Sequence, residues 1–251
     1  MRGVAERLTT TWWFSHSSAA LLWGCWTWHL QPEVHVTQLS NPRIRKNADP
    51  TLERHWTNLP ERDRSEIAGV PVTALERTAV DCARELREPG ALVVADSALR
   101  LGADPGVMQE ILRESAGKRG VRRARLVIGL ADGRSESPGE SLVRWIAHDY
   151  GLPPTELAIP VTTALGEFFI DLGWPDLKIG IEFDGAVKYS GDEYGDPIEV
   201  LAAQRRRQAA LEAEGWTILR VTWDELEDSH LLALRLLKAL HSAGWRQSPA
   251  R

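Results

Sequence analysis

The chain has 251 residues, enough to bury a substantial hydrophobic core and to form two domains. Its composition, 43% hydrophobic and 26% charged, is that of an ordinary soluble protein. The formal net charge of −5 argues against tight nucleic-acid binding by the surface as a whole, although a local basic patch could still bind phosphates.

Two features of the N-terminal half bear on location. Cys25 and Cys82 have neither metal-ligand spacing nor the pattern of a disulfide framework, so we expect two core cysteines in a reducing cytoplasm. Residues 12–30 are apolar, but His16 and His29 interrupt them, and no run approaches the roughly 18 apolar residues that a membrane span needs. We therefore expect a cytoplasmic protein without a membrane partner.

Residues 1–130 are predicted to form a mainly helical α+β domain. The predicted elements are a helix at 15–22, a strand at 34–37, and helices at 73–86, 89–101 and 105–115, with a last helix ending at 130. Thr73 and Glu76 have the spacing of a capping box, in which a hydroxyl and a carboxylate satisfy free backbone N–H groups at the start of a helix.

The most basic stretch of the chain is Lys118 to Arg125, which reads KRGVRRAR. One interpretation is a solvated helix face beside a linker. The other is a patch, including Arg122 and Arg123, that contacts the phosphates of a nucleic acid. The sequence leaves both interpretations open.

Residues 131–139, ADGRSESPG, are predicted to link the first domain to a second one at 140–251, because they are small, polar and contain Gly and Pro. The elements predicted beyond the linker are a helix at 138–149, a strand at 157–161, a hairpin at 168–184, a helix at 197–214, a strand at 216–223 and a helix at 224–240. This α-β-β-β-α-β-α order predicts an α/β fold with a mixed sheet and helices on its faces.

An acidic hairpin at 168–185, FFIDLGWPDLKIGIEFDG, is the most informative part of the second domain. Asp171 is expected to end its first strand, while Glu182 and Asp184 share one face of the second strand. The other face carries large apolar side chains, namely Ile179, Ile181 and Phe183. The acids are therefore expected to face a cleft.

Clustered carboxylates repel one another unless a cation or protons neutralise them, and hard cations favour oxygen ligands. The hairpin therefore predicts a site for Mg²⁺ or Mn²⁺. The alternative is that Asp184-Gly185 is a turn signal and Glu182 an exposed strand residue.

Several features spaced over residues 135–240 form one pattern. They are Glu140, Asp171, the run IEFDG at 181–185, Arg207 followed by Leu211 and Gly215-Trp216, and Ile218-Leu219-Arg220. In this combination the region resembles an endonuclease-like domain related to very-short-patch-repair endonucleases, within the PD-(D/E)XK nuclease superfamily. The resemblance implies a restriction-endonuclease-like fold, a divalent metal at the end of the central hairpin, and hydrolysis of phosphodiester bonds in DNA.

Carried over by position, the resemblance implies that Asp171 and Glu182 bind the metal, with Asp184 as a third ligand or a local organiser. Glu140 would be the acid of the first helix. It also has the spacing of a capping box with Ser137, and the two roles can coexist.

The basic residues of the second domain have two interpretations. Arg206 and Arg207 would face the cleft and contact phosphate or an acid, or they would lie on a solvated helix face. The superfamily signature has a lysine two residues after the second acid, where this chain has Asp184, so the departure bears on catalysis more than on the fold. Lys188 stands where related domains often have histidine, and it could steady charge at the scissile phosphate or be a surface lysine.

The N-terminal half resembles a second family. Its motifs are SHSSAALLWG at 15–24, VHVT at 34–37, GVPVTALERTAVDCAR at 69–84 and ADSALRLG at 95–102. They are similar to those of actinobacterial abortive-infection antitoxin-like proteins. Such proteins typically carry an N-terminal winged helix-turn-helix, which this sequence is not expected to contain, so a protein partner could supply DNA recognition.

The expected function is therefore a Mg²⁺-dependent DNA endonuclease. The alternative is a non-catalytic antitoxin-like or transcriptional regulatory protein that uses a nuclease-like fold as a binding module. The acids favour the first function, whereas Asp184 at the lysine position and the net charge of −5 favour the second.

Overall fold

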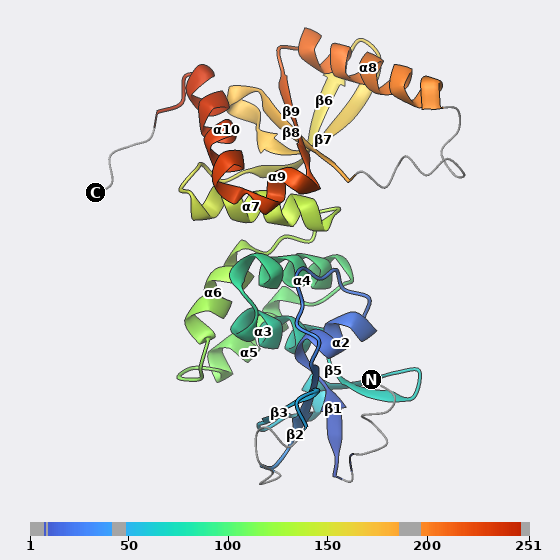
Figure 1. Ribbon diagram of the computed structural model, residues 1–251, viewed down its shortest axis with the longest axis vertical. Coiled ribbons are helices and arrows are strands. Elements are labelled where there is room, and N and C mark those ends of the chain that lie inside the picture. The colour runs from blue at the N-terminus through green and yellow to red at the C-terminus, as the bar shows by residue number, and fades with distance from the viewer. Residues whose placement is uncertain (1–7, 9, 42–48, 186–196, 247–251) are drawn as a thin grey trace. The chain divides into compact units, whose positions relative to one another are not determined.

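The computed structural model describes residue 8 and residues 10–41, 49–185 and 197–246. The chain divides into two compact units, Met1–Gly133 and Arg134–Arg251. Each unit combines a mixed sheet with helices (Figure 1), so the expected α/β class is confirmed.

A five-stranded sheet forms one side of the N-terminal unit. Its strands are β1 (Trp12–Phe14), β2 (Val34–Gln38), β3 (Leu52–Trp56), β4 (Arg64–Ile67) and β5 (Val70–Thr73), in the order β3-β2-β1-β5-β4. The strands β2 and β3 run parallel, with His35 opposite Glu53 and Thr37 opposite His55. Because side chains alternate along a strand, these residues lie on the face opposite that of the buried Val36.

Helices complete the N-terminal unit. They are α2 (His16–Leu22), α3 (Leu75–Glu85), α4 (Glu88–Arg100), α5 (Pro105–Glu114) and α6 (Val121–Leu130), and the last four pack together in Figure 1. Their bounds agree with the predicted helices to within a few residues. Cys25 and Cys82 are both buried and free, as expected of core cysteines.

The predicted capping box at Thr73 is wrong. Thr73 is the last residue of β5 and pairs with Arg64, so it is held in the sheet and Ala74 takes the cap position of α3. The Thr73 hydroxyl instead bonds that of Thr78 at 2.7 Å. The Glu76 carboxylate accepts the backbone N–H of Asp104, 3.0 Å away.

Gly120 lets the start of α6 lie against the end of α3. Its φ is +77°, and a Cβ atom there would lie 2.1 Å from the carbonyl oxygen of Arg84. The contact is reinforced by two arginines, because Arg84 donates to the carbonyl of Arg119 at 3.1 Å and Arg123 donates to the carbonyl of Arg84.

The C-terminal unit has the predicted element order, except that the last predicted helix, at 224–240, is divided into two helices. Its four-stranded sheet, β6-β7-β8-β9, consists of β6 (Glu156–Thr163), β7 (Gly166–Trp174), β8 (Ile179–Asp184) and β9 (Thr217–Thr222). Its helices are α7 (Pro138–Asp149), α8 (Pro197–Ala213), the short α9 (Trp223–Glu227) and α10 (Ser229–Ser242). The neighbours of β8 differ in direction, since β7 is antiparallel and β9 parallel to it.

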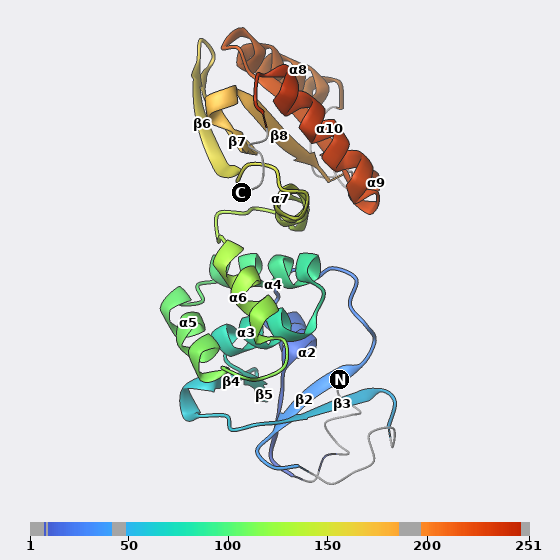
Figure 2. The ribbon, with the colours of Figure 1, turned by 90° about the vertical axis from the view of Figure 1, so that its left-hand side faces the viewer.

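Helices cover both faces of this sheet (Figure 2). On one face Leu211 of α8 packs in a cluster with Ile170 and Trp216. On the other face α7 approaches so closely that a Cβ atom on Gly139 would lie 2.4 Å from the ring of Phe183. The central strand β8 is therefore enclosed on both faces.

Over the described residues, none of the helices combines the length and the apolar character needed to cross a bilayer. The expectation that Trp12–Leu30 does not span a membrane agrees with its structure, since it contains the short strand β1 and the seven-residue helix α2.

Candidate functional site

Asp171 links the two strands of the acidic hairpin. It lies within β7, which continues to Trp174 and is followed by a 3-10 turn at Pro175–Leu177, so the expectation that it ends the strand is wrong. The strand continues because Leu172 and Trp174 are buried, at 0% and 4% exposure. The Asp171 carboxylate accepts the backbone N–H of Phe183 at 2.9 Å, so it lies beside the residues that flank Phe183 on β8.

Those flanking residues are Glu182 and Asp184. The Glu182 side chain is only 12% exposed, and its Oε1 lies 3.0 Å from Nη1 of Arg207 on α8. Arg207 also donates to the carbonyl of Phe169 at 2.6 Å. Of the two partners expected for Arg207, the structure therefore shows the acid.

The face of β8 that carries Glu182 is packed in part, and the cleft expected beside the acids stays a prediction. The face is packed beside Gly180, where a Cβ atom would lie 2.8 Å from both Ile170 and Ile218. Helix α8 then brings Arg207 over Glu182. The space beside Gly180 is filled because Ile170 and Ile218, from the two neighbouring strands, pack against it.

Glu140 begins α7 as a buried acid, 4% exposed. Its backbone N–H donates to the Ser137 hydroxyl at 3.2 Å, and that hydroxyl donates to the Glu140 carboxylate at 2.7 Å. The carboxylate also accepts the N–H of Glu136 at 2.8 Å, so the predicted cap is present with Glu136 in place of Ser137 as backbone donor.

The pKa of Glu140 is raised. Burial is the largest cause of the rise of this pKa to about 7, the negative charge of Asp171 contributes, and the hydrogen bonds from Glu136 and Ser137 oppose the shift. The capping role expected for Glu140 is confirmed, and its role as an acid of the site stays a prediction.

The other predicted residues are less closely associated with these acids. Asp184 is half-buried at the end of β8. Arg206 on α8 and Arg122 on α6 are exposed, while Arg123 is half-buried and donates to the end of α3. Lys188 lies outside the described residues.

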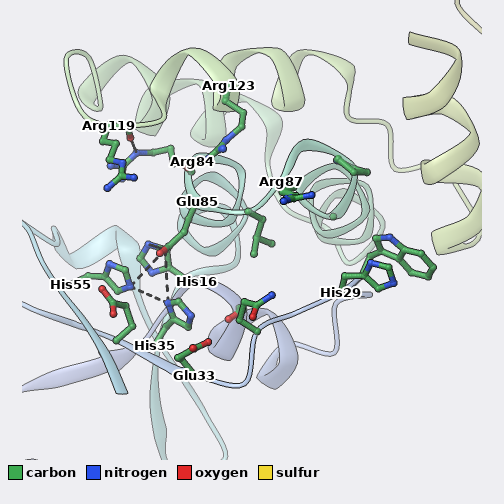
Figure 3. A pocket seen from close by; sticks show the side chains of 17 residues that line it. His16, His29, Glu33, His35, His55, Arg84, Glu85, Arg87, Arg119 and Arg123 are labelled. Atoms are coloured by element: carbon green, nitrogen blue, oxygen red, sulfur yellow. Dashed lines mark hydrogen bonds and ion pairs between the residues drawn. The ribbon is translucent and has the colours of Figure 1, made fainter. Parts of the chain in front are cut away.

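A second group of ligand-type side chains lies in the N-terminal unit, and no sequence pattern predicted it. We call it the His/Glu cluster; its members are His16, His35, His55 and Glu85. Each offers one ligand atom, and these four atoms lie within 4.8 Å of one another. Figure 3 shows the three imidazoles converging below the Glu85 carboxylate.

The cluster borders a cavity of about 790 Å³ (Figure 3). Basic side chains also line this cavity, namely Arg84, Arg87, Arg119 and Arg123. The basic stretch predicted at 118–125 thus contributes Arg119 and Arg123 to a pocket, whereas Arg122 points to solvent. The stretch at 118–125 therefore contains both solvent-exposed residues and residues that line the cavity.

Comparison with known proteins gives relatives without a stated activity. The chain is similar to two uncharacterised proteins from two strains of Mycobacterium tuberculosis, MT2308 and Rv2248, each 35% identical over 180 residues. The similarity covers 70% of this chain and 64% of each relative, slightly less than two thirds of their length. No protein-family profile matches the chain, and no solved structure matches it.

Proposed function

We propose that the C-terminal unit is a divalent-metal-dependent DNA endonuclease whose acids are Asp171, Glu182 and Glu140. The observation that carries the proposal is the 2.9 Å bond from the Phe183 N–H to the Asp171 carboxylate. It connects the acid of β7 to the acidic end of β8 in a mixed sheet enclosed by helices. That arrangement agrees with the nuclease resemblance of residues 135–240.

The donors suit a hard cation. All three side chains offer carboxylate oxygens, which Mg²⁺ and Mn²⁺ prefer to nitrogen or sulfur. Interaction with Asp171 contributes to the raised pKa of Glu140, and a cation would relieve this repulsion between the two acids. When bound, Mg²⁺ would supply positive charge to stabilise the phosphate oxygens during reaction.

The residues of the proposed site have different roles. Asp171 and Glu182 would hold the cation, and Arg207, which pairs with Glu182 at 3.0 Å, would contact a phosphate oxygen beside that acid. In the hydrolysis, the oxygen of a water molecule bonds to phosphorus. The bond from phosphorus to the leaving sugar oxygen breaks, the attacking water gives up a proton, and the leaving oxygen takes one up. DNA is the proposed partner, in the cytoplasm, with a further protein as a possible source of sequence recognition.

Nicking of supercoiled plasmid with Mg²⁺ or Mn²⁺ tests this proposal. We expect the wild-type chain to nick DNA and Asp171→Asn and Glu182→Gln to lose activity by about 100-fold or more, because each loses a charged ligand. Glu156→Gln is a matched control, since Glu156 is an exposed acid on β6 of the same unit.

Failure of the wild type to nick DNA with either metal would contradict the proposal. Salt-dependent DNA binding without cleavage would instead favour the regulatory alternative, because phosphate contacts weaken as salt rises. Equal activity in Asp171→Asn and wild type would show that the acids are not the active site.

A further inference from the structure

The fold of the N-terminal unit brings the His/Glu cluster together from four elements. His16 begins α2, His35 and His55 lie on the adjacent parallel strands β2 and β3, and Glu85 ends α3. Backbone bonds join two of these elements, since the Ser15 N–H donates to the carbonyl of His35 at 3.1 Å. The cluster is thus held by the core of the unit.

The backbone of His16 is left-handed. Its φ is +51°, in a region that few residues other than Gly adopt but in which His, like Asn and Asp, is enriched. Its Nδ1 lies 3.0 Å from the Ser15 hydroxyl, which leaves Nε2 directed to Glu85 at 3.2 Å. A hydrogen bond of this kind commonly fixes the orientation of a metal-binding imidazole.

The distances between ligand atoms resemble the edges of a tetrahedron. His35 Nδ1 lies 3.0 Å from His55 Nε2, and the Glu85 carboxylate oxygen lies 3.7 Å from the latter and 3.9 Å from the former. A tetrahedral zinc site with bonds of about 2.0–2.1 Å has ligands about 3.4 Å apart. None of the ligand atoms is more than 4.8 Å from another, so one ion can lie among the four once an imidazole ring rotates.

Burial disfavours the charged form of all three imidazoles. Burial lowers the pKa of His55 to about 4, with further lowering by the nearby His35. Burial likewise lowers the pKa of His16 and of His35. The acids that interact with the cluster from neighbouring positions, Glu33, Glu53 and Asp81, add negative charge that favours a cation, while Arg77 and Arg84 oppose it.

We propose that the His/Glu cluster is a binding site for one divalent transition-metal ion of the Zn²⁺ class. Three nitrogen donors and one carboxylate oxygen suit Zn²⁺ or Co²⁺, and they do not suit Mg²⁺, which prefers oxygen alone. The site lies in the N-terminal unit and is independent of the acids proposed to cut DNA. The cavity of about 790 Å³ gives an ion a route to it.

One local rearrangement accompanies binding. The rings of His16 and His55 are stacked, with centroids 3.8 Å apart and planes at 22°. Because a metal ion lies near the plane of an imidazole that binds it, one ring must rotate about χ2. This torsion is broad in histidine, so the rotated ring still has an allowed rotamer.

Titration of the metal-stripped full chain with Zn²⁺, in excess Mg²⁺ to occupy oxygen sites, tests the proposal. We expect one Zn²⁺ per chain, a rise in melting temperature, and with Co²⁺ the visible absorption of a tetrahedral ion. His55→Ala is expected to lower the Zn²⁺ affinity by about 100-fold or more, and Glu85→Gln by about 10-fold or more.

Two controls make the test specific. His29→Ala removes another histidine of the same cavity and is expected to bind Zn²⁺ as the wild type does. Asp171→Asn is also expected to keep full Zn²⁺ affinity, so failure of the nuclease proposal would leave this result unchanged. Glu85→Gln preserves shape at a side chain that is 38% exposed, so its loss of affinity cannot be attributed to unfolding if circular dichroism is unchanged.

Absence of stoichiometric Zn²⁺ binding by the wild type would overturn the proposal. So would equal Zn²⁺ affinity in wild type, His55→Ala and Glu85→Gln. A Co²⁺ spectrum typical of octahedral oxygen coordination would also contradict it, because it would place the ion at carboxylates rather than at imidazoles.

Discussion

Arg77 shows how single charged residues hold the N-terminal unit together. Its side chain is 5% exposed and lies 2.6 Å from Asp81 and 3.0 Å from Asp63, both of which are 1% exposed. Arg62 and Arg84 each approach one of these acids at 3.1 Å. The two buried carboxylates thus depend on Arg77 as their shared partner.

Replacement of Arg77 by Met is expected to destabilise the protein by about 3 kcal/mol, because two buried carboxylates lose a partner while each keeps a neighbouring arginine. Urea unfolding of the full chain, followed by circular dichroism, measures this. Arg113→Met is the control, since Arg113 is 72% exposed and lies 3.7 Å from Glu110. A loss from Arg77→Met as small as the control's, below about 0.5 kcal/mol, would contradict the assignment.

Glu140 makes stability depend on pH. Its pKa is about 7 in the folded chain and lies near 4.5 when unfolded, so the folded state holds a proton that the unfolded state releases between these values. The folded state therefore loses stability as pH rises through this window, by up to about 3 kcal/mol. Glu140→Gln cannot titrate and lacks this loss.

Unfolding free energies of wild type and Glu140→Gln, measured in metal-free buffer at about pH 5 and pH 8, check this prediction. The wild type is expected to lose more stability than the variant as pH rises. Parallel curves for the two proteins would mean that Glu140 is not perturbed.

The residues of the sites differ in how far sequence could reveal them. Asp171 and Glu182 lie on one hairpin, so their local pattern predicted their proximity. His16, His35 and His55 are separated by about 20 residues each and carry no ligand spacing. Only the parallel pairing of β2 with β3 and the start of α2 bring them together, and sequence periodicity contains no such information.

At the level of elements, glycines determine how closely helices pack. Gly120 at the start of α6 has φ +77° and faces the carbonyl of Arg84. Gly129 near the end of the same helix faces open space, because a Cβ atom added there would meet no neighbouring element within 4 Å. The same substitution should therefore have opposite effects at the two positions.

Gly120→Ala is expected to cost about 2 kcal/mol or more, since the added carbon overlaps a backbone oxygen and the backbone angle is unfavourable. Gly129→Ala is expected to be neutral or to stabilise by up to about 1 kcal/mol, because Ala favours the helix. Thermal unfolding of both variants measures the difference. Similar melting temperatures would show that α6 does not depend on this close approach.

Elements whose signals are local were predicted well, and those set by tertiary pairing were not. Pro138 and Ser137 correctly mark the start of α7. The capping box predicted at Thr73 is absent because Thr73 pairs within the sheet as part of β5, so it does not cap the helix. The packing of Ile170 and Ile218 onto Gly180 of β8 depends on the pairing of three strands, so the sequence pattern did not reveal it.

The whole molecule combines two units with different donor chemistry. The N-terminal unit presents nitrogen ligands beside an arginine-lined cavity, and the C-terminal unit presents carboxylates on a mixed sheet. The proposed metals accordingly differ, with Zn²⁺ in the first unit and Mg²⁺ or Mn²⁺ in the second.

Selective metal removal should separate these roles. A chelator selective for Zn²⁺ is expected to lower the melting temperature of the wild type in excess Mg²⁺ and to leave that of His55→Ala unchanged, because only the wild type carries Zn²⁺. Differential scanning calorimetry in the presence and absence of chelator measures both. An equal decrease in the two proteins would place the Zn²⁺ outside the His/Glu cluster.

The most direct measurement of the central claim is the ratio of plasmid-nicking rates of wild type and Asp171→Asn in Mn²⁺, with Glu156→Gln alongside. Asp171 and the Phe183 N–H form the contact on which the proposed active site depends. We predict a ratio of about 100 or more for Asp171→Asn and about 1 for Glu156→Gln. A ratio near 1 for Asp171→Asn, or no nicking by the wild type, would contradict the account.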